Sequence, residues 1–325
     1  MNNARLHIFN PDTDYALASG RRYYTPPAQM VALRKRLALL PALYAHPGDA
    51  ILLLDAGMSE ENTMYARIAE EKCLRILTLT DLAGAPDILE DYIPDPWGWN
   101  LSIRQILLDA GADPTLLPTT AQLERLRALS HRRTTIEFLK ALPAKLMAGI
   151  SIPFETDDTE RAMNTWEENR KIFFKAPWSS SGRGILLGDD IERRHVEPWV
   201  RGIIRRQGSV MVEKAYERRL DFATEWMMTA GEARFLGFSV FLTSRRGKYH
   251  GNVEAGQEEL SSMIERATHL DLDEIVRGQK SALERVIGKD YDGPAGIDML
   301  ATADGNVNCC VELNIRHTMG MTGLL

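Results

Sequence analysis

The sequence predicts a mixed α/β protein in which a parallel-sheet domain is followed by a region with antiparallel sheets. In the first third of the chain, short apolar runs alternate with segments of helical periodicity, as they do in strand–helix–strand units. In the last third, long β-rich segments follow one another without helical crossovers. The 325 residues exceed the length of ~250–300 residues over which one core usually extends, so we expect two or three packed lobes.

The first 130 residues are expected to form one α/β domain. Strands are predicted at Leu6–Phe9, Ile51–Leu54 and Arg75–Leu79. Helices are predicted at Pro27–Leu39 and Glu60–Lys72, and a capping box at Thr119 and Gln122 begins a further short helix. Residues 93–100 are rich in turn formers and are interpreted as a surface loop pinned by tryptophans, with a cleft lined by Trp97 and Trp99 as the alternative.

The remaining residues are expected to form an α+β region. The predicted helices are Thr134–Leu142, Thr156–Arg170, Gln257–Thr268 and Leu272–Val286. The predicted strands are Lys171–Ala176, Ile185–Leu187, Val210–Glu213, Leu220–Thr229, Arg234–Leu242, Gly296–Ala301 and Val307–Asn314. An Asp304-Gly305 turn makes a hairpin of the last two strands.

Composition argues against several classes of protein. Hydrophobic residues make up 44% of the chain and charged residues 26%, as in ordinary folded proteins. The formal charge of −6 argues against a general nucleic-acid binder. Three cysteines are too few for a disulfide framework, and the longest apolar region, Leu37–Ala45, is broken by Pro41 and too short to span a bilayer. We therefore expect a cytoplasmic protein with no membrane association and no nucleic-acid partner.

The segment from Phe173 to Gly184 places Lys175 on an apolar strand, followed by a loop of serines and glycines. Small residues let backbone amides approach a phosphate, and a strand-borne lysine supplies a fixed cation. The segment is neither a Walker A motif nor a dinucleotide fingerprint. A simple glycine–serine hairpin loop with a solvent-reaching lysine fits the same residues, so the segment alone leaves both interpretations open.

A second segment, Val210–Lys214, is an apolar strand that ends in Glu213 and Lys214, and Asp221 lies seven positions further on. Free backbone groups at a strand end can bind the edge of an adenine ring. A carboxylate there can accept hydrogen bonds from an exocyclic amine or from ribose hydroxyls. An exposed ion pair at a strand end is the alternative interpretation.

The closing hairpin, Gly296–Arg316, is the strongest of the three signals. Folding about Gly305 brings Asp298 opposite Glu312, and the strand period of two places Glu312 and Asn314 on one face. The opposite, apolar face would carry Val307, Cys309, Val311 and Leu313. Two carboxylates and an amide oxygen suit Mg²⁺ bridging nucleotide phosphates, whereas facing carboxylates without a cation repel each other. A polar, solvated sheet face is the alternative.

The order of these three segments resembles that of the ATP-grasp superfamily, the fold of D-alanine–D-alanine ligase and other carboxylate–amine ligases. The resemblance covers about residues 129–321 and implies an ATP-grasp fold of two α+β lobes preceded by an α/β parallel-sheet domain. The implied domains are residues 1–130 as the N-terminal α/β domain, 131–208 as the small lobe with a phosphate lid, and 209–325 as the large lobe with an adenine hinge and a metal hairpin.

The resemblance also implies roles for individual residues. Lys175 would contact the α- and β-phosphates of ATP, and Arg316 would stabilise phosphoryl oxygens. The lid over the phosphates would consist of Ser179, Ser180, Ser181, Gly182, Arg183 and Gly184. The adenine and ribose would be held by Glu213, by backbone near Lys214 and Tyr216, and by Asp221. Magnesium, or manganese in its place, would bind Asp298, Glu312 and Asn314. A further phosphate-binding cation is expected at Arg133, with Arg132 as the second choice.

The implied activity is that of an ATP- and magnesium-dependent ligase. A small-molecule or peptide carboxylate would form an acyl-phosphate, which an amine or thiol would then attack. An ATP-grasp-type kinase acting on a small hydroxyl acceptor and a non-catalytic nucleotide-binding protein are the alternatives. Many of these ligases carry an arginine just before the metal-binding aspartate, but here Ile297 precedes Asp298. The substrate-side cation is therefore left open among Arg218, Arg219, Arg245 and Arg246. A homodimer is also left open.

Overall fold

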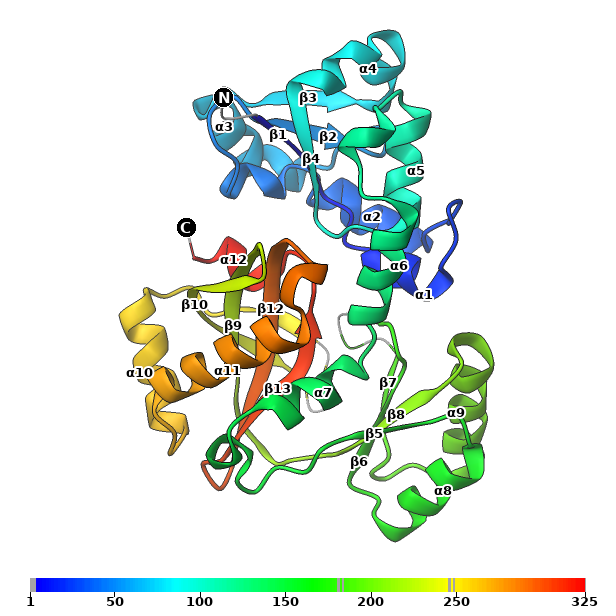
Figure 1. The fold of residues 1–325 in the computed structure, drawn as a ribbon, viewed down its shortest axis with the longest axis vertical. Helices are drawn as coiled ribbons and strands as arrows, with labels where there is room; N and C mark the ends of the chain where they lie inside the picture. The colour runs from blue at the N-terminus through cyan, green and yellow to red at the C-terminus, as the bar shows by residue number, and fades with distance from the viewer. Residues whose placement is uncertain (1–3, 180–181, 183, 245–246, 248, 325) are drawn as a thin grey trace. The chain divides into compact units, whose positions relative to one another are not determined.

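The computed structural model describes residues 4–179, 182, 184–244, 247 and 249–324 (Figure 1). Ser180, Ser181 and Arg183 of the predicted lid lie outside the described residues, as do Arg245 and Arg246. The chain divides into two compact units, one ending at Arg127 and one running from Ala128 to Leu324. Within the described residues, no helix combines the length and the apolar character needed to cross a membrane.

The first unit contains the predicted parallel sheet, with strand order β3-β2-β1-β4. Its strands are β1 (Ala4–Ile8), β2 (Ala50–Leu53), β3 (Arg75–Thr78) and β4 (Tyr92–Pro96). Leu6, Ile8 and Leu52 are almost fully buried and pack with Ile103 and Leu107 of the helix that follows β4. The central strand β2 is a continuous apolar run and is buried throughout, as expected for a parallel strand covered by crossover helices.

Short helices connect these strands. The α-helices are α1 (Thr13–Ser19), α2 (Ala28–Arg36), α3 (Thr63–Glu71), α4 (Leu79–Gly84), α5 (Leu101–Asp109) and α6 (Thr120–Leu129), the last of which continues into the second unit. The 3₁₀ helices are η1 (Leu40–Leu43), η2 (Glu60–Asn62), η3 (Pro86–Asp91) and η4 (Pro114–Leu116). The predicted capping box is confirmed, because the Thr119 hydroxyl accepts from the backbone of Gln122, whose side chain accepts from the Thr119 backbone N–H.

Strand β4 corrects the prediction of a surface loop at residues 93–100. It pairs in parallel with β1, in a register that sets Pro94 opposite Leu6 and Pro96 opposite Ile8. Prolines are tolerated because β4 is an edge strand, where one side of the backbone needs no ladder partner. Trp97 is buried and packs edge-to-face on Phe9 with ring centroids 5.0 Å apart, so it belongs to the core of this unit.

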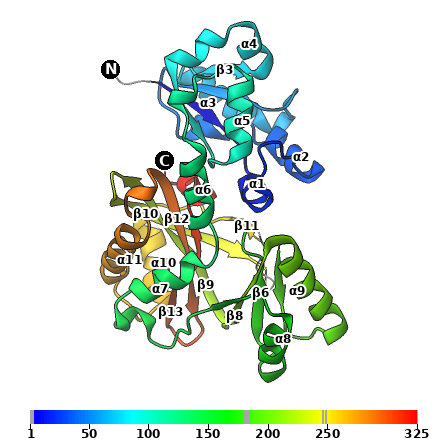
Figure 2. The same cartoon turned by 45° about the vertical axis from the view of Figure 1, so that its right-hand side comes forward.

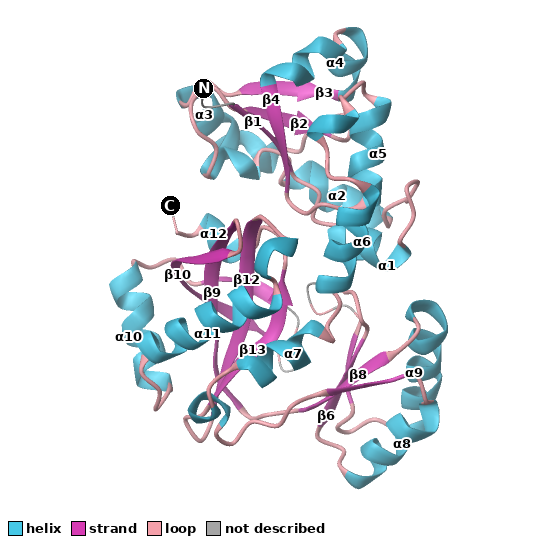
Figure 3. Ribbon diagram, in the orientation of Figure 1, coloured by secondary structure: helices cyan, strands magenta, loops and turns pink. Residues whose placement is uncertain are grey.

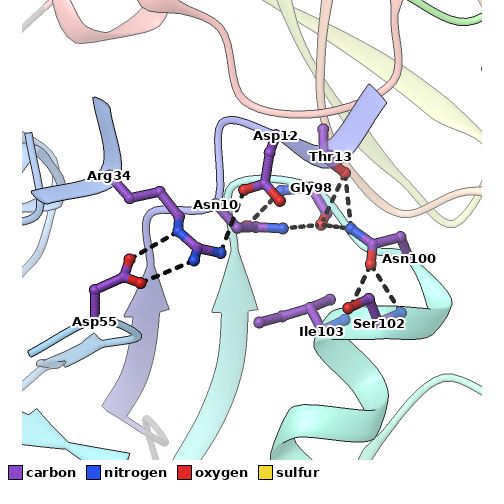
Figure 4. A network of polar contacts seen from close by, with 9 residues as sticks. All are labelled: Asn10, Asp12, Thr13, Arg34, Asp55, Gly98, Asn100, Ser102 and Ile103. Carbon is purple, nitrogen blue, oxygen red and sulfur yellow. Dashed lines mark hydrogen bonds and ion pairs between the residues drawn. The ribbon is translucent and has the colours of Figure 1, made fainter. Parts of the chain in front are cut away.

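A polar network fastens the loops that follow β1 and β4 (Figure 4). Asn10 Nδ2 donates to the carbonyl of Gly98 over 2.8 Å, and Asn100 Nδ2 donates to Thr13 Oγ1 over 3.0 Å. A Cβ at residue 98 would lie 2.6 Å from Thr13 Oγ1, so this position requires glycine. Open α/β sheets usually bind ligands at this edge, but here the chain's own polar groups join the two loops.

The second unit contains two antiparallel sheets. The large sheet has the order β11-β10-β9-β12-β13, and the small sheet has the order β5-β8-β6-β7. The large-sheet strands are β9 (Arg218–Thr229), β10 (Glu232–Thr243), β11 (Tyr249–Asn252), β12 (Gly293–Thr302) and β13 (Val307–Asn314). The small-sheet strands are β5 (Phe154–Thr156), β6 (Ile172–Lys175), β7 (Ile185–Leu187) and β8 (Val210–Lys214).

Each sheet of the second unit is packed by its own helices. Helices α8 (Thr159–Glu168) and α9 (Arg193–Gln207) lie together on one side of the small sheet (Figure 2) and share a core with it. Helices α10 (Gln257–Ala267) and α11 (Leu272–Val286) lie along the large sheet (Figure 3). The remaining short helices are α7 (Thr134–Ala141), η5 (Ala144–Met147), η6 (Gly288–Asp290) and α12 (Met319–Thr322).

Sheet membership does not follow the predicted boundary between residues 208 and 209. Strand β8 was predicted for the large lobe, but it pairs with β5 and β6 of the small sheet. Helix α7 was predicted for the small lobe, but it packs on α11 and β13. The helix predicted at Thr156–Arg170 is α8 and begins at Thr159, because Thr156 is the last residue of β5. Helix α9 and strand β11 were not predicted. Strand pairing and helix packing join residues far apart in sequence, so no local pattern reports them.

Candidate functional site

The second unit contains a cavity of about 170 Å³ between strands of its two sheets. Most of the predicted phosphate- and metal-binding residues in the described chain line this cavity. From the small sheet and its loop come Phe173, Lys175, Gly182 and Ile185. From the large sheet and the segment that follows it come Asp221, Glu225, Asp298, Glu312, Asn314 and Arg316. Strands that are distant in sequence therefore bring the predicted groups to one place.

The closing hairpin brings the two predicted carboxylates together. Asp298 on β12 is paired with Glu312 on β13, as predicted. Near the turn, however, Ala301 is paired with Val307, and a bulge shifts the register between there and Asp298. A bulge interrupts the alternation of side chains. This explains why Val311 lines the cavity beside Glu312, whereas it was predicted for the opposite face.

Asp298 is the most strongly perturbed carboxyl group in this cavity. Burial, the charge of Glu312 and the charge of Glu225 together raise its pKa to about 8. Arg316 and a hydrogen bond with the side chain of Asn314 act in the opposite direction and lower this pKa. This environment disfavours the ionised form of the Asp298 carboxyl group, so a cation bound beside it would stabilise the site.

The donor set of Asp298, Glu312 and Asn314 fits a magnesium ion that also takes phosphate oxygens. In the part of the chain that the structure describes, no cluster of three or more His, Cys, Asp or Glu side chains is arranged to hold a metal. Magnesium commonly takes only one or two carboxylates from the protein and fills its other positions with water and substrate phosphates. The facing carboxylates and the raised pKa of Asp298 agree with such a site.

Lys175 lies at the end of β6 and is almost fully buried. Its ammonium group forms an ion pair with Glu213 on the neighbouring strand β8. The predicted phosphate-binding cation and the predicted adenine-binding carboxylate are therefore adjacent. Glu213, Lys214 and Tyr216 are not among the residues that line the cavity. Tyr216 instead accepts a hydrogen bond from the backbone of Ser151 over 2.7 Å, and its ring lies under the Lys214 ammonium group.

The two described glycines of the predicted lid have left-handed backbone, with φ of 74° at Gly182 and 71° at Gly184. A Cβ at residue 184 would lie 2.8 Å from the Cβ of Ser179, so the loop closes tightly where it meets β7. The carbonyl of Gly184 accepts from Ala176 N over 2.7 Å. These contacts fasten the two ends of the loop to each other.

Arg132 connects this loop to the candidate metal site. Its guanidinium group donates to the carbonyl of Ala176 and to both oxygens of Ser179 over 3.1 Å each. The same group lies 2.8 Å from Glu312 Oε1, and the side chain is only 6% exposed. Arg132 therefore joins the first residue of the predicted lid to a predicted metal ligand.

Arg133 was the preferred phosphate-binding cation in the sequence, but the structure places it elsewhere. Its side chain is 57% exposed and forms an ion pair with Glu155 over 3.1 Å. It also contacts the ring of His131, and it is not among the residues that line the cavity. Of the two adjacent arginines, it is Arg132 that the fold turns toward the predicted site.

The remaining predicted residues lie at the cavity wall. Asp221 accepts a hydrogen bond from Thr243 and lies 3.4 Å from Arg218, which is one of the cations left open in the sequence. Both Asp221 and Arg218 line the cavity. Arg316 also lines it and donates to the carbonyl of His317 over 3.0 Å.

Sequence reasoning missed Glu225, which lines the same cavity and is 1% exposed. Burial raises the pKa of this carboxyl group to about 7, although hydrogen bonds from Thr318 and Ser239 lower it. A signal was present in the sequence. Glu225 shares a strand face with Asp221, and it stands among apolar residues, where an unpaired glutamate is rare.

No protein-family model matches the sequence, and the search of curated proteins finds no match. Solved structures with a similar fold include the biotin carboxylase of Campylobacter jejuni in complex with β-γ-ATP. The match has a TM-score of 0.54 and 13% identity, and it covers 90% of this chain and 65% of the carboxylase. The N5-carboxyaminoimidazole synthetase of Staphylococcus aureus, complexed with ADP, matches with a TM-score of 0.52 and 13% identity over 98% of this chain and 73% of the synthetase.

A third similar structure is the biotin carboxylase domain dimer of the Hydrogenobacter thermophilus 2-oxoglutarate carboxylase, in complex with MgADP, ADP and bicarbonate. It matches with a TM-score of 0.50 and 14% identity over 88% of this chain and 62% of that domain. The chain thus spans less than two thirds of the length of both carboxylase chains. At these identities the similarity establishes the fold.

Proposed function

Because the chain has the ATP-grasp fold that its sequence predicted, we propose that it is an ATP- and magnesium-dependent ligase. In this proposal a small-molecule or peptide carboxylate attacks the γ-phosphate of ATP and forms an acyl-phosphate with release of ADP. A nucleophile, which is an amine or a thiol, then attacks the acyl carbon. The bond from that carbon to the phosphate oxygen breaks, and inorganic phosphate leaves.

One observation carries this proposal. The facing carboxylates of Asp298 and Glu312, with Asn314 beside them, share a single cavity with the buried ammonium group of Lys175. Positively and negatively charged side chains around one cavity suit a magnesium–polyphosphate substrate. Its anionic oxygens need cationic partners, and its magnesium ion needs anionic ones.

The residues of this chain would bind and orient the nucleotide. Lys175 would exchange its ion pair with Glu213 for phosphate oxygens, which would free Glu213 to accept from the adenine amino group. Asp221 would accept from the ribose hydroxyls. Arg132, in place of Arg133, would contribute a second cation on the phosphate side, since its guanidinium group adjoins both the lid and Glu312.

The bound magnesium ion would neutralise charge on the β- and γ-phosphate oxygens, with Asp298, Glu312 and Asn314 as its protein ligands. Arg316 would stabilise the oxygens of the transferring phosphoryl group. The loop that contains Gly182 and Gly184 would cover the phosphates and exclude water, which would otherwise hydrolyse the acyl-phosphate. Positioning and charge neutralisation supply most of the catalysis in phosphoryl transfer.

A screen for ADP release with magnesium, ATP and pooled carboxylates tests this function. Hydroxylamine in the same wells converts an acyl-phosphate to a hydroxamate, which is detected by its colour with ferric iron. The proposal predicts ADP release that depends on one carboxylate and is accompanied by its hydroxamate. A stable phosphorylated product with no hydroxamate would favour a kinase instead. Tight ATP binding without any ADP release would favour a non-catalytic protein.

A further inference from the structure

His131 lies in the turn before α7 and is almost fully buried, although it is not among the residues that line the cavity. Its ring nitrogen Nδ1 accepts from the backbone N–H of Arg133 over 3.0 Å. A side chain that accepts from the backbone two residues further on fixes the start of a helix, as asparagine and aspartate commonly do. His131 therefore sets the path of the backbone through Arg132 and Arg133.

The same hydrogen bond decides the tautomer of His131. A neutral imidazole has one nitrogen that accepts and one that donates, and a backbone N–H cannot turn away from Nδ1. Nε2 therefore carries the ring hydrogen, and Glu155 Oε1 lies 3.5 Å from it. The Arg133 guanidinium group lies 3.0 Å from Nε2, which cannot accept in this tautomer, and it pairs with the same Glu155 oxygen over 3.1 Å.

These contacts decide which of two adjacent arginines reaches the predicted lid. Arg133 has helical backbone, with φ of −59° and ψ of −27°. Successive side chains on a helix point about 100° apart, so the two arginines cannot face the same group. Glu155 holds Arg133 on one side. Arg132 is thereby turned toward Ser179 and Glu312.

His131 also packs on the segment that leads into the predicted lid. Its ring meets the ring of Trp178 edge-to-face, with centroids 4.5 Å apart. The side chain of Gln207 in turn accepts from the backbone N–H of Trp178 over 2.9 Å and donates to its carbonyl over 3.2 Å. The backbone N–H of Arg132 donates to the carbonyl of Pro177 over 3.1 Å. The turn before α7 and the base of the lid are therefore fastened to each other.

Arg132, held in this way, keeps one nitrogen for a ligand. Its Nε donates to Ala176, and its Nη2 serves Ser179 and Glu312. Its Nη1 is buried and has no hydrogen-bond partner among the residues that the structure describes. A buried donor on a charged group is costly to leave unpaired, so Nη1 favours an anionic oxygen. A phosphate oxygen of the proposed nucleotide meets this need.

We infer that His131 is a positioning residue for the phosphate side of the site. It fixes the backbone of Arg133 and, with Glu155, keeps that side chain away from the lid. Arg132 is left in the one orientation in which it reaches the lid and Glu312. This role rests on the proposed function and deepens it, because it adds a residue that acts on nucleotide binding without contacting the nucleotide.

The test measures the dissociation constant of the ATP analogue AMP-PNP, with magnesium, by titration calorimetry. His131→Ala removes the ring. His131→Asn restores an acceptor at the place of Nδ1, and His131→Gln carries the same amide group one methylene further from the backbone. We expect the dissociation constant to rise about 10-fold in the Ala and Gln variants and about 3-fold or less in His131→Asn. His195→Ala, at an exposed position on α9, is the matched control and should leave it unchanged.

A double-mutant cycle with Arg132→Met distinguishes positioning from general damage to the fold. If His131 acts through Arg132, then His131→Ala should change the dissociation constant less than about 2-fold once the guanidinium group is absent. A further rise of about 10-fold in the double variant would overturn this role, because His131 would then act independently of Arg132. Equal losses in His131→Asn and His131→Gln would also overturn it, and that comparison decides the matter if His131→Ala does not fold.

The titration also separates this role from the proposed ligase function. Wild-type protein that binds AMP-PNP but releases no ADP with any carboxylate would refute the ligase function, and an effect of His131 on binding would still stand. Wild-type protein that releases ADP, with AMP-PNP binding unchanged in His131→Ala, would refute the positioning role alone. Wild-type protein that binds no nucleotide would refute both.

Discussion

Replacing Arg132 by methionine tests whether this arginine joins the predicted lid to the candidate metal site. The substitution keeps a long apolar side chain and removes the guanidinium group. In the folded protein this group donates to Ala176, to both oxygens of Ser179 and to Glu312. The adjacent Arg133 provides a matched control, because its ion pair with Glu155 is formed by a side chain that is 57% exposed.

The expected magnitudes differ because the two ion pairs differ in burial. Breaking a buried pair by removing one partner costs about 3–5 kcal/mol, chiefly because the other charge is left unpaired. Glu312 keeps 21% of its side chain exposed, so we expect Arg132→Met to cost about 3 kcal/mol, at the lower end of that range. Exposed pairs contribute about 0.2–1 kcal/mol, so Arg133→Met should cost less than about 1 kcal/mol.

Urea denaturation followed by circular dichroism measures both free energies of unfolding by linear extrapolation. Equal losses in the two variants, or a loss below about 1 kcal/mol for Arg132→Met, would refute the assignment of Arg132 as a buried connection.

Three further predictions concern the carboxylates and their surroundings. Glu312→Gln keeps an acceptor for Arg132 but leaves this buried guanidinium group without an anionic partner, so we expect ADP release to fall at least about 100-fold together with a measurable loss of stability; wild-type turnover would contradict the metal assignment. Because the pKa of Asp298 is raised to about 8, the folded protein holds a proton there that the unfolded chain releases above about pH 4. Without magnesium or nucleotide, the free energy of unfolding should therefore fall as pH rises from about 4 to about 8, by up to about 1.4 kcal/mol per pH unit. Denaturation curves of Asp298→Asn should lack this component, and an unchanged slope would refute it. Gly320→Ala should cost about 1–3 kcal/mol by overpacking against Glu225, whereas Gly84→Ala, whose Cβ would meet nothing within 4 Å, should be neutral or stabilising; similar melting temperatures for the two variants would count against the close packing at Gly320.

Much of the candidate site was predictable because its residues are neighbours in a hairpin. Asp298 and Glu312 are joined by one turn, and a strand period of two is enough to bring them together. The bulge that moves Val311 to the cavity face was not predictable, since nothing in the local pattern marks where an extra residue enters a strand. Lys175 and its glycine–serine loop were recognised for the same reason as the hairpin, because all of their residues are contiguous.

The missed elements depend on partners that are distant in sequence. Strand β4 contains two prolines and looks like a loop until β1 pairs with it as an edge strand. Strand β8 joins the small sheet because β6 and β5 flank it. A sequence pattern can indicate that a segment is a strand. Which strand it pairs with depends on how much apolar surface each alternative pairing buries.

The sequence by itself determined the α/β class, the antiparallel hairpin with its facing carboxylates and the order of segments that resembles the ATP-grasp superfamily. Each of these depends on contacts between near neighbours, which periodicity and turn chemistry report directly. Only the tertiary structure decided that Arg132 and not Arg133 pairs with Glu312, and that Glu225 forms part of the cavity wall. These two facts depend on how β6, β9 and β13 pack together, and the free energy of that packing is spread over residues far apart in the chain.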